Sequence, residues 1–328
     1  MTLHESPRLP GSDRNLHAPG HGRGSEDFEV NLVSLNQWQI AWRRFRRHRL
    51  AVFGSLLFLA ICAIAVIGPF LVPFNFYELP APISHCPGDP RSLGSNGCPP
   101  SLEHLFGTTG GLGRDVLTVV VNGARLSLLI GVGASVFAAI IGAIMGGLAG
   151  YFGGWLDNLL MRIVDVLLSL PILFVILVVS KFLGGGSWIS IVFVFALLGW
   201  PNMARLVRSL FLTLRSEVFV EAARAVGVGN RRIIFRHILP NAVSPLIVAM
   251  TLSIAGVIVT EAFVSFLGFG VDPTQPTWGN ALSGAVTYIP NGNWWWPLFP
   301  GMAIVLTVLG INFAGDGLRD ALDPRSKF

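Results

Sequence analysis

Residues 219–241 read FVEAARAVGVGNRRIIFRHILPN, a polar and basic stretch that lies between two long apolar segments. Ser216 stands where it can cap a short helix that begins at Glu217, and Gly227 and Gly229 are expected to stop this helix. The predicted helix carries a stripe of small apolar residues at helical spacing: Val218, Ala222, Ala225 and Val226. The stretch therefore begins with a short helix that has one apolar side.

A second short helix is predicted to follow the two glycines. Asn230 is its expected N-cap, Arg231 its first residue and Pro240 the residue that breaks it. Its apolar side carries Ile233, Ile234 and Ile238. Residues 217–240 would then form a helix-turn-helix protrusion, which we call the knob.

The knob has the composition of a docking surface. Small alanine side chains let a partner approach the first helix closely, and the surrounding arginines offer charge to acidic groups: Arg224, Arg231, Arg232 and Arg236. The alternative is an ordinary basic loop on the cytoplasmic side of a membrane, because positive-inside bias alone places arginines there. Composition by itself does not separate these two interpretations.

The overall composition excludes a soluble domain. Of the 328 residues, 52% are hydrophobic and 12% are charged, with a mean hydropathy of +0.63, whereas soluble domains carry about 25% charged residues. A helix needs about 20 apolar residues to cross the hydrocarbon layer. Six stretches come close to this length: 50–74, 126–151, 159–179, 188–210, 245–271 and 296–314. The sequence therefore predicts an all-α polytopic membrane protein with six transmembrane helices.

The placement of lysine and arginine sets the predicted orientation. With both termini in the cytoplasm, only four of the 23 basic residues fall outside: Arg91, Arg114, Arg125 and Lys181. The knob is then cytoplasmic. The pI of about 9.6 does not indicate a nucleic-acid partner, because the basic residues border membrane segments instead of forming a separate basic domain.

Segments outside the spans complete the predicted organisation. Residues 1–34 lack apolar periodicity and predict a disordered cytoplasmic tail, and residues 35–49 predict an amphipathic helix along the membrane interface. The first span, 50–74, is interpreted as an uncleaved anchor, because its apolar residues continue beyond a signal-like cleavage site. The later segments are an extracytoplasmic loop with its lead-in, a transmembrane core and a cytoplasmic C-terminus: 75–125, 126–316 and 317–328.

Two of the three cysteines, Cys86 and Cys98, lie in the predicted extracytoplasmic loop. On the oxidising side of a membrane such a pair most simply forms a disulfide that closes a small loop. A metal site that also uses His85 and His104 is the alternative, although no tight spacing of ligand pairs supports it. We therefore expect a disulfide between Cys86 and Cys98.

Several positions inside the spans have a predicted structural role. Gly142, Gly146 and Gly150 recur every four residues, which predicts a surface for close helix contact. Arg162 and Asp165 lie three residues apart, which predicts a local ion pair. In the fourth span, a proline at position 201 would permit a bend. None of these features indicates chemistry.

Glu261 is the one carboxylate well inside the fifth apolar stretch. An acid within the membrane is a candidate for the translocation pathway, where it would face an aqueous cavity. The alternative is a buried carboxyl group that is hydrogen-bonded to a neighbouring helix. Both interpretations stay open at the level of sequence.

The sequence contains no motif for nucleotide binding or hydrolysis. Neither lysine, Lys181 or Lys327, lies in a P-loop, and the patterns HExxH and GxSxG do not occur. We therefore do not expect an enzyme. If transport needs ATP, the energy must arrive through contact with another protein, and the knob is the obvious place for that contact.

The knob also matches a known signature. It resembles the EAA motif of ABC-importer permeases at Glu221, Ala222, Ala223, Gly227, Leu239 and Pro240, with His237 at a position where the motif has isoleucine. Further runs resemble C-type permeases of the dipeptide, oligopeptide and nickel importer family: 104–109, 112–117, 123–128, 150–155, 199–201, 265–270 and 315–324. Thr109 replaces the aspartate that is usual in this family. The resemblance spans nearly all of the chain beyond the N-terminal tail.

This resemblance implies a type I ABC importer permease fold with a cytoplasmic coupling helix. The implied partners are a second, homologous permease, two ABC ATPase subunits, an extracytoplasmic solute-binding protein and the lipid bilayer of a bacterial or archaeal plasma membrane. ATP and Mg²⁺ would bind to the ATPases, so the chain itself would need no cofactor and no metal. The residues implied to couple the ATPases to transport are Glu221, Ala222, Ala223, Gly227, Arg231, Leu239 and Pro240.

The resemblance also implies the class of solute. Dipeptides or oligopeptides are expected, and nickel or another small solute of the same family is the alternative. An ion-coupled secondary transporter would instead carry charged relay residues in several spans. A membrane enzyme or assembly factor without a transported solute is the remaining alternative.

Overall fold

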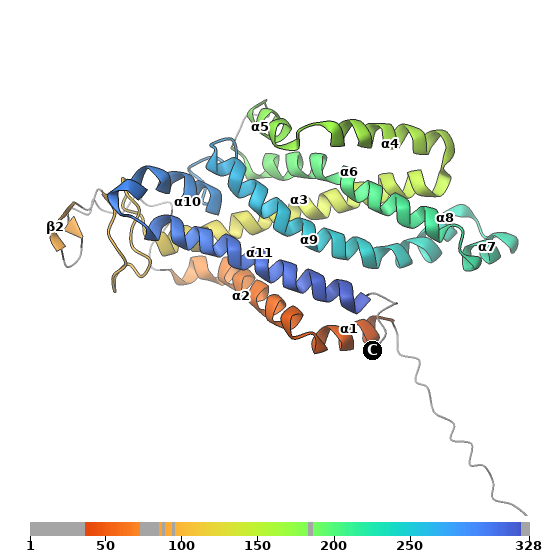
Figure 1. Cartoon of the computed structure of the whole chain (residues 1–328), viewed down its shortest axis with the longest axis horizontal. Coiled ribbons are helices and arrows are strands. Elements are labelled where there is room, and N and C mark those ends of the chain that lie inside the picture. The colour runs from red at the N-terminus through yellow and green to blue at the C-terminus, as the bar shows by residue number, and fades with distance from the viewer. Residues whose placement is uncertain are drawn as a thin grey trace, which may run out of the picture. The chain divides into compact units, whose positions relative to one another are not determined.

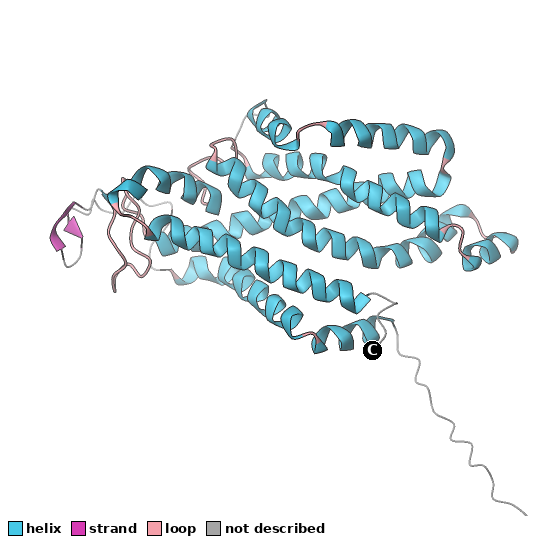
Figure 2. Ribbon diagram, in the orientation of Figure 1, coloured by secondary structure: helices cyan, strands magenta, loops and turns pink. Residues whose placement is uncertain are grey.

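The computed structural model is mostly helical over the residues that it describes, which are 37–72, 76, 85–86, 89–93, 96–182 and 186–322. The predicted disordered tail, 1–34, lies outside these residues. In chain order the helices are α1 (Gln37–Arg47), α2 (Arg49–Leu71), α3 (Val116–Phe152), α4 (Gly154–Ser169), α5 (Ile172–Phe182), α6 (Trp188–Leu214), α7 (Val218–Ala225), α8 (Asn230–Ile233), the π-helix η2 (Ile234–Ile238), α9 (Leu239–Phe266), α10 (Trp278–Ala285), the 3-10 helix η3 (Val286–Asn291) and α11 (Trp295–Leu322). Two short strands, β1 (His85–Cys86) and β2 (Asp89–Leu93), pair antiparallel (Figure 2).

Five helices are long and apolar enough to cross a membrane: Arg49–Leu71, Val116–Phe152, Trp188–Leu214, Asn230–Phe266 and Trp295–Leu322. They correspond to five of the six predicted spans. Helices α1, α7 and α8 lie at one end of the bundle and α10 at the other (Figure 1). We call these the knob end and the loop end. The predicted bend at Pro201 does not interrupt α6, which continues past it to Leu214.

The remaining predicted span, 159–179, which is the third in chain order, is not one straight helix. Helices α4 and α5 together pass the same length and hydropathy criteria, but they are bent by 91° where they meet. Pro171 causes the break, because the residue before a proline is pushed out of the helical region and Leu170 has an extended backbone, with ψ of 142°. The described residues therefore hold five candidate spans, or six if this bent pair counts as one broken span.

Helices α3 and α6 make the most extensive helix contact in the described part of the chain, and the regularly spaced glycines of α3 lie in it. A Cβ atom at Gly142 would collide with Met203, and one at Gly146 with the backbone of Ala204. At Gly150 it would lie 2.7 Å from the carbonyl oxygen of Arg208. Because each of these glycines lacks a side chain at the contact, the backbones of α3 and α6 approach each other closely.

Ion pairs join the same helix α6 to α4. The Arg208 guanidinium donates to the Asp157 carboxylate, with Nη2 2.7 Å from Oδ2, and Arg205 Nη2 lies 2.8 Å from Asp165 Oδ1. Asp165 therefore pairs across helices, and the expected local pair with Arg162 was wrong. Sequence spacing could not reveal a partner that lies 40 residues away.

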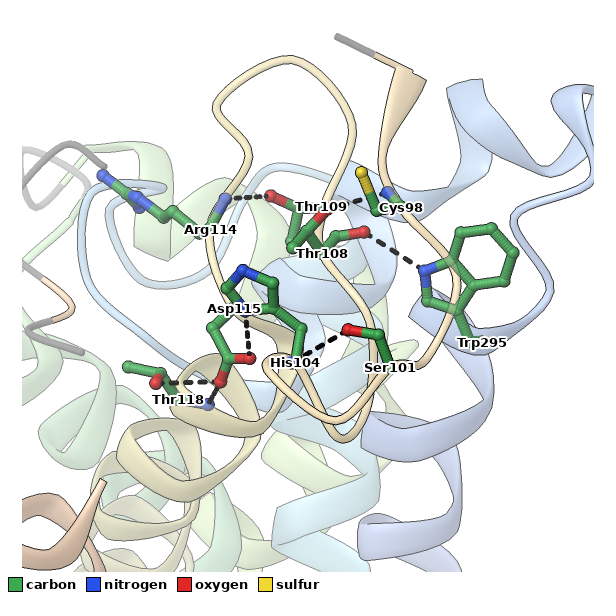
Figure 3. A network of polar contacts seen from close by, with 9 residues as sticks. All are labelled: Cys98, Ser101, His104, Thr108, Thr109, Arg114, Asp115, Thr118 and Trp295. Atoms are coloured by element: carbon green, nitrogen blue, oxygen red, sulfur yellow. Dashed lines mark hydrogen bonds and ion pairs between the residues drawn. The ribbon is translucent and has the colours of Figure 1, made fainter. Parts of the chain in front are cut away.

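At the loop end, polar contacts fasten the segment before α3 onto the bundle (Figure 3). Asp115 caps α3 by accepting the backbone N–H of Thr118 at 2.8 Å, and His104 Nδ1 lies 3.0 Å from the same carboxylate. The indole N–H of Trp295 donates to the Thr108 carbonyl at 3.1 Å. The cap explains why α3 begins at Val116, ten residues before the predicted span.

The two loop cysteines are bonded to each other, with Cys86 and Cys98 joined by a disulfide. The alternative of a metal site with His85 and His104 was wrong, because both thiols are used in this bond. Across the described part of the chain, no group of three or more His, Cys, Asp or Glu residues could hold a metal ion. The disulfide ties β1 to the segment that Trp295 and Asp115 hold in place.

Glu261 lies in a hydrogen-bond network between three helices next to the loop end. Its carboxylate is 1% exposed and accepts hydroxyl hydrogen bonds from Ser265 at 2.8 Å and from Ser127 of α3 at 3.3 Å. Ser127 in turn accepts the backbone N–H of Trp278, the first residue of α10, at 3.2 Å. Thr277 caps α10 by accepting the backbone N–H of Asn280 at 3.1 Å. One acid therefore connects α3, α9 and α10.

These contacts favour the hydrogen-bonded alternative for Glu261, and its role in the translocation pathway stays a prediction. Glu261→Leu should lower the thermal stability of the purified subunit, because each buried hydroxyl left without a partner costs about 1–3 kcal/mol. Glu261→Gln should keep most of the stability, since the hydroxyl groups can rotate to accept from the amide. Melting curves of both variants in detergent test this order.

Peptide uptake by the same variants separates the two roles. If the carboxyl group is structural, Glu261→Gln should import at close to the rate of the unchanged protein. A stable Glu261→Gln variant that has lost uptake would instead assign the charge to the pathway.

Candidate functional site

The knob projects from the end of the bundle as α7 and α8 (Figure 1). Helix α7 begins at Val218, with Glu217 as its N-cap residue and no side-chain cap hydrogen bond. Ser216, the expected cap, donates its hydroxyl to the carbonyl of Thr213 at 2.9 Å and so closes the end of α6 instead. The helix was correctly predicted, but the residue expected to cap it was wrong.

Gly227 ends α7, as predicted, through a paired hydrogen-bond motif. Its φ of +80° is left-handed, and its N–H donates to Arg224 at 2.9 Å while the N–H of Val228 donates to Ala223 at 3.0 Å. These two bonds satisfy carbonyl groups that the end of a helix leaves free. A residue with a Cβ atom is strained at this φ, so Gly227 fixes the direction in which the chain leaves α7.

The second knob helix is continuous with a membrane span. It begins at Asn230, with Gly229 as the N-cap residue, so Asn230 does not act as the cap. The expectation that Pro240 breaks the helix was also wrong, because the chain passes from α8 through η2 into α9 without interruption. Pro240 follows the π-helical turn η2 almost directly, so the helix passes this proline with a local change of hydrogen bonding instead of ending there. Asn230–Phe266 thus forms one 37-residue helical segment.

The small apolar stripe predicted on α7 faces solvent and does not pack against the rest of the protein. Val218 and Val226 are 78% and 80% exposed, and Ala222 and Ala225 are exposed beside them. The buried side of α7 is formed instead by Val220 and Ala223, which pack in one cluster with Ile233 and Ile238. We call the exposed stripe the outer face of α7. An uncovered apolar patch rimmed by polar residues is typical of a protein contact site.

A basic hollow lies on the second knob helix, along α8, η2 and the start of α9. It has a volume of about 740 Å³ and is lined by Gly229, Arg231, Arg232, Phe235, Arg236 and Pro240. Arg231, Arg232 and Arg236 are exposed, and no ion pair joins them to an acid in the described part of the chain. With Phe235 62% exposed among them, the hollow can accept an acidic group together with an apolar one.

The predicted coupling residues occupy three different positions on the knob. Glu221 and Ala222 are exposed on α7, whereas Ala223 is buried beneath it. Arg231 and Pro240 line the basic hollow, and Leu239 packs against the cluster under α7. Glu261 and the Cys86–Cys98 disulfide lie elsewhere. Sequence reasoning missed Val220, although its spacing of three from Ala223 is itself helical.

Two family models match the chain. The model described as "Binding-protein-dependent transport system inner membrane component" matches residues 142–328. The model described as "N-terminal TM domain of oligopeptide transport permease C" matches residues 36–85. Together they cover the first span and everything from Gly142 in α3 onward, including the knob.

Curated relatives match over most of their length. The dipeptide transport system permease protein DppC of Bacillus subtilis is 39% identical over 303 residues, covering 92% of this chain and 90% of the relative. The oligopeptide transport system permease protein OppC of the same species is 36% identical, covering 95% and 97%. A putative peptide permease protein of Brucella suis is 40% identical, covering 87% and 90%.

These matches agree with the helical architecture and with the absence of a nucleotide-binding motif from the sequence. The family consists of permease subunits without a cofactor, and a binding-protein-dependent system implies ATPase and binding-protein partners. The chain therefore belongs to the family of binding-protein-dependent transport system inner membrane components, as a multi-pass permease subunit of an ABC transporter.

Proposed function

We propose that this permease imports peptides, either dipeptides or longer oligopeptides. Relatives whose names assign them to dipeptide and oligopeptide transport align with about nine-tenths of the chain. The match at residues 36–85 to the oligopeptide permease C model supports the same solute class. The solute would come from a binding protein at the loop end, where the disulfide and the Asp115 cap hold the surface in one shape.

The knob end is proposed to face the cytoplasm. Exposed arginines gather there in α1, in the knob and in the last turn of α11, whereas the described loop end carries few basic residues. Cytoplasmic surfaces of membrane proteins carry the excess of lysine and arginine. Both ends of the chain would then be cytoplasmic, and α1 would lie along the inner surface of the membrane.

The single observation that carries the coupling proposal is the outer face of α7. Its small side chains permit close approach, and the basic hollow on the second knob helix supplies positive charge. We assign this combined surface to the contact with an ABC ATPase. A full complex would hold two ATPases, this subunit and a second, homologous permease.

Continuity of the helix gives this contact a mechanical consequence. Because α8, η2 and α9 form one segment, a displacement of the knob is delivered to a membrane span. When the ATPases close on ATP, the knob would move with the groove that holds it, and the bundle would turn its cavity outward. This is alternating access by population shift, in which ATP stabilises one of two conformations.

Reconstitution of the complete transporter tests the proposed function. Proteoliposomes that contain both permeases and both ATPases should accumulate a labelled dipeptide or oligopeptide when ATP and the binding protein are supplied on their correct sides. Uptake driven by an ion gradient through this subunit without ATPases would contradict the proposal. Nickel uptake without peptide uptake would correct the solute class alone.

The substitution Gly227→Val tests the knob. A β-branched residue at φ of +80° is strained by about 1–2 kcal/mol or more, so the end of α7 should shift while the spans still insert. Recovery of the ATPases with the affinity-purified permease should fall. Gly268→Val is the matched control, because Gly268 also has a left-handed φ, +81°, and no atom within 4 Å of its added Cβ, but it follows the far end of α9, away from the knob. Equal ATPase recovery with both variants would count against the assigned contact.

A further inference from the structure

One tyrosine at the end of α3 contacts both helices of the knob. The Tyr151 side chain is 6% exposed. Its hydroxyl group donates to Oδ1 of Asn230, the first residue of α8, at 2.9 Å. The guanidinium carbon of Arg224, in the last turn of α7, lies 5.7 Å from the centre of its ring, within the range of a cation–π contact. Residues 79 positions apart in the chain are thereby joined.

The backbone at the same point holds the entrance to the knob. Nη1 of Arg215, which links α6 to α7, donates to the carbonyl of Gly150 at 3.1 Å and to that of Tyr151 at 3.3 Å. These carbonyl groups belong to the last turn of α3, where they have no partner within the helix. The entrance, the first helix and the second helix of the knob therefore all meet the end of α3.

The end of α3 is itself locked to α6. At Gly150 an added Cβ atom would lie 2.7 Å from both the Arg208 carbonyl oxygen and Cβ of Phe211. Phe211 and Tyr151 belong to the cluster that also contains the buried side of α7. A rotation of the knob against α3 would have to break the Tyr151 contacts first, whereas a rotation with α3 and α6 would keep them.

We propose that Tyr151 is a positioning residue for energy coupling, which fixes the angle of the knob on α3 so that motion of the knob moves α3 and α6 together with α9. This inference rests on the proposed function, because it assumes that an ATPase moves the knob. It adds a second route of transmission to the continuous α8–α9 segment. This second route depends on the hydrogen bond between the hydroxyl of Tyr151 and the side-chain oxygen of Asn230.

Tyr151→Phe tests the inference by removing one oxygen while the ring, its packing and the Arg224 contact stay. In the complete reconstituted transporter, ATPase recovery and basal ATP hydrolysis should be unchanged. The number of ATP molecules hydrolysed per peptide imported should rise by about twofold to tenfold, the factor that corresponds to the net strength of one hydrogen bond. A residue that only stabilised the fold would lower the melting temperature and leave this ratio unchanged.

Variants of the acceptor sharpen the test. Asn230→Ala should raise the ratio as Tyr151→Phe does, and the double variant should be no worse than either alone, because all three lack the same bond. Asn230→Asp retains an acceptor oxygen and should restore coupling. Tyr288→Phe, the same chemical change in η3 at the loop end, is the matched control and should behave as the unchanged protein.

The outcomes also separate this inference from the proposed function. An unchanged ratio in Tyr151→Phe, or additive effects of the two single variants, would overturn the role of Tyr151 while leaving the knob as the ATPase contact. Failure of the unchanged permease to bind ATPases or to import peptide with ATP would instead overturn the proposed function, and with it this inference.

Discussion

The packing of Val220 and Ala223 against Ile233 and Ile238 is the contact on which the proposed ATPase-binding surface depends. It buries one side of α7 and thereby turns the small apolar residues of the opposite side outward. A short helix of eight residues would not hold this orientation alone, because isolated helices of that length are marginal in water. Tertiary burial, not helix propensity, therefore presents the face that we assign to the ATPase.

Contacts in the rest of the molecule connect that face of α7 to the membrane spans. Helices α3 and α6 approach closely through glycines, α6 is paired to α4 by two ion pairs, and the knob continues directly into α9. At the loop end, the Glu261 hydroxyl contacts hold α3, α9 and α10 together. Under the proposed coupling, a permease subunit without nucleotide chemistry of its own would receive force at the knob end and rearrange contacts near the loop end.

Much of the fold could be predicted from sequence. The exceptions all depend on tertiary contacts, which a local sequence pattern does not contain. Hydropathy located five spans, and left-handed Gly227 ended α7 where expected. The effect of a proline on a helix could not be predicted from sequence alone. Pro171 breaks a span, whereas Pro240 is accommodated in the first turn of α9. The facing of α7 could not be predicted, because two sets of residues both recur at helical spacing. The partners of Asp165 and Glu261 were also hidden, since Arg205 and Ser127 lie 40 and 134 residues away.

The central claim is that the outer face of α7 is cytoplasmic and covered by an ATPase. A single cysteine at Val218, which is 78% exposed, tests both parts when Cys62 is replaced by serine and the labelling reagent is a maleimide that cannot cross membranes. The account predicts labelling in inverted vesicles stripped of ATPases, no labelling in intact cells, and protection once purified ATPases are added back. Labelling from the outside of intact cells, or labelling that bound ATPases do not reduce, would contradict it.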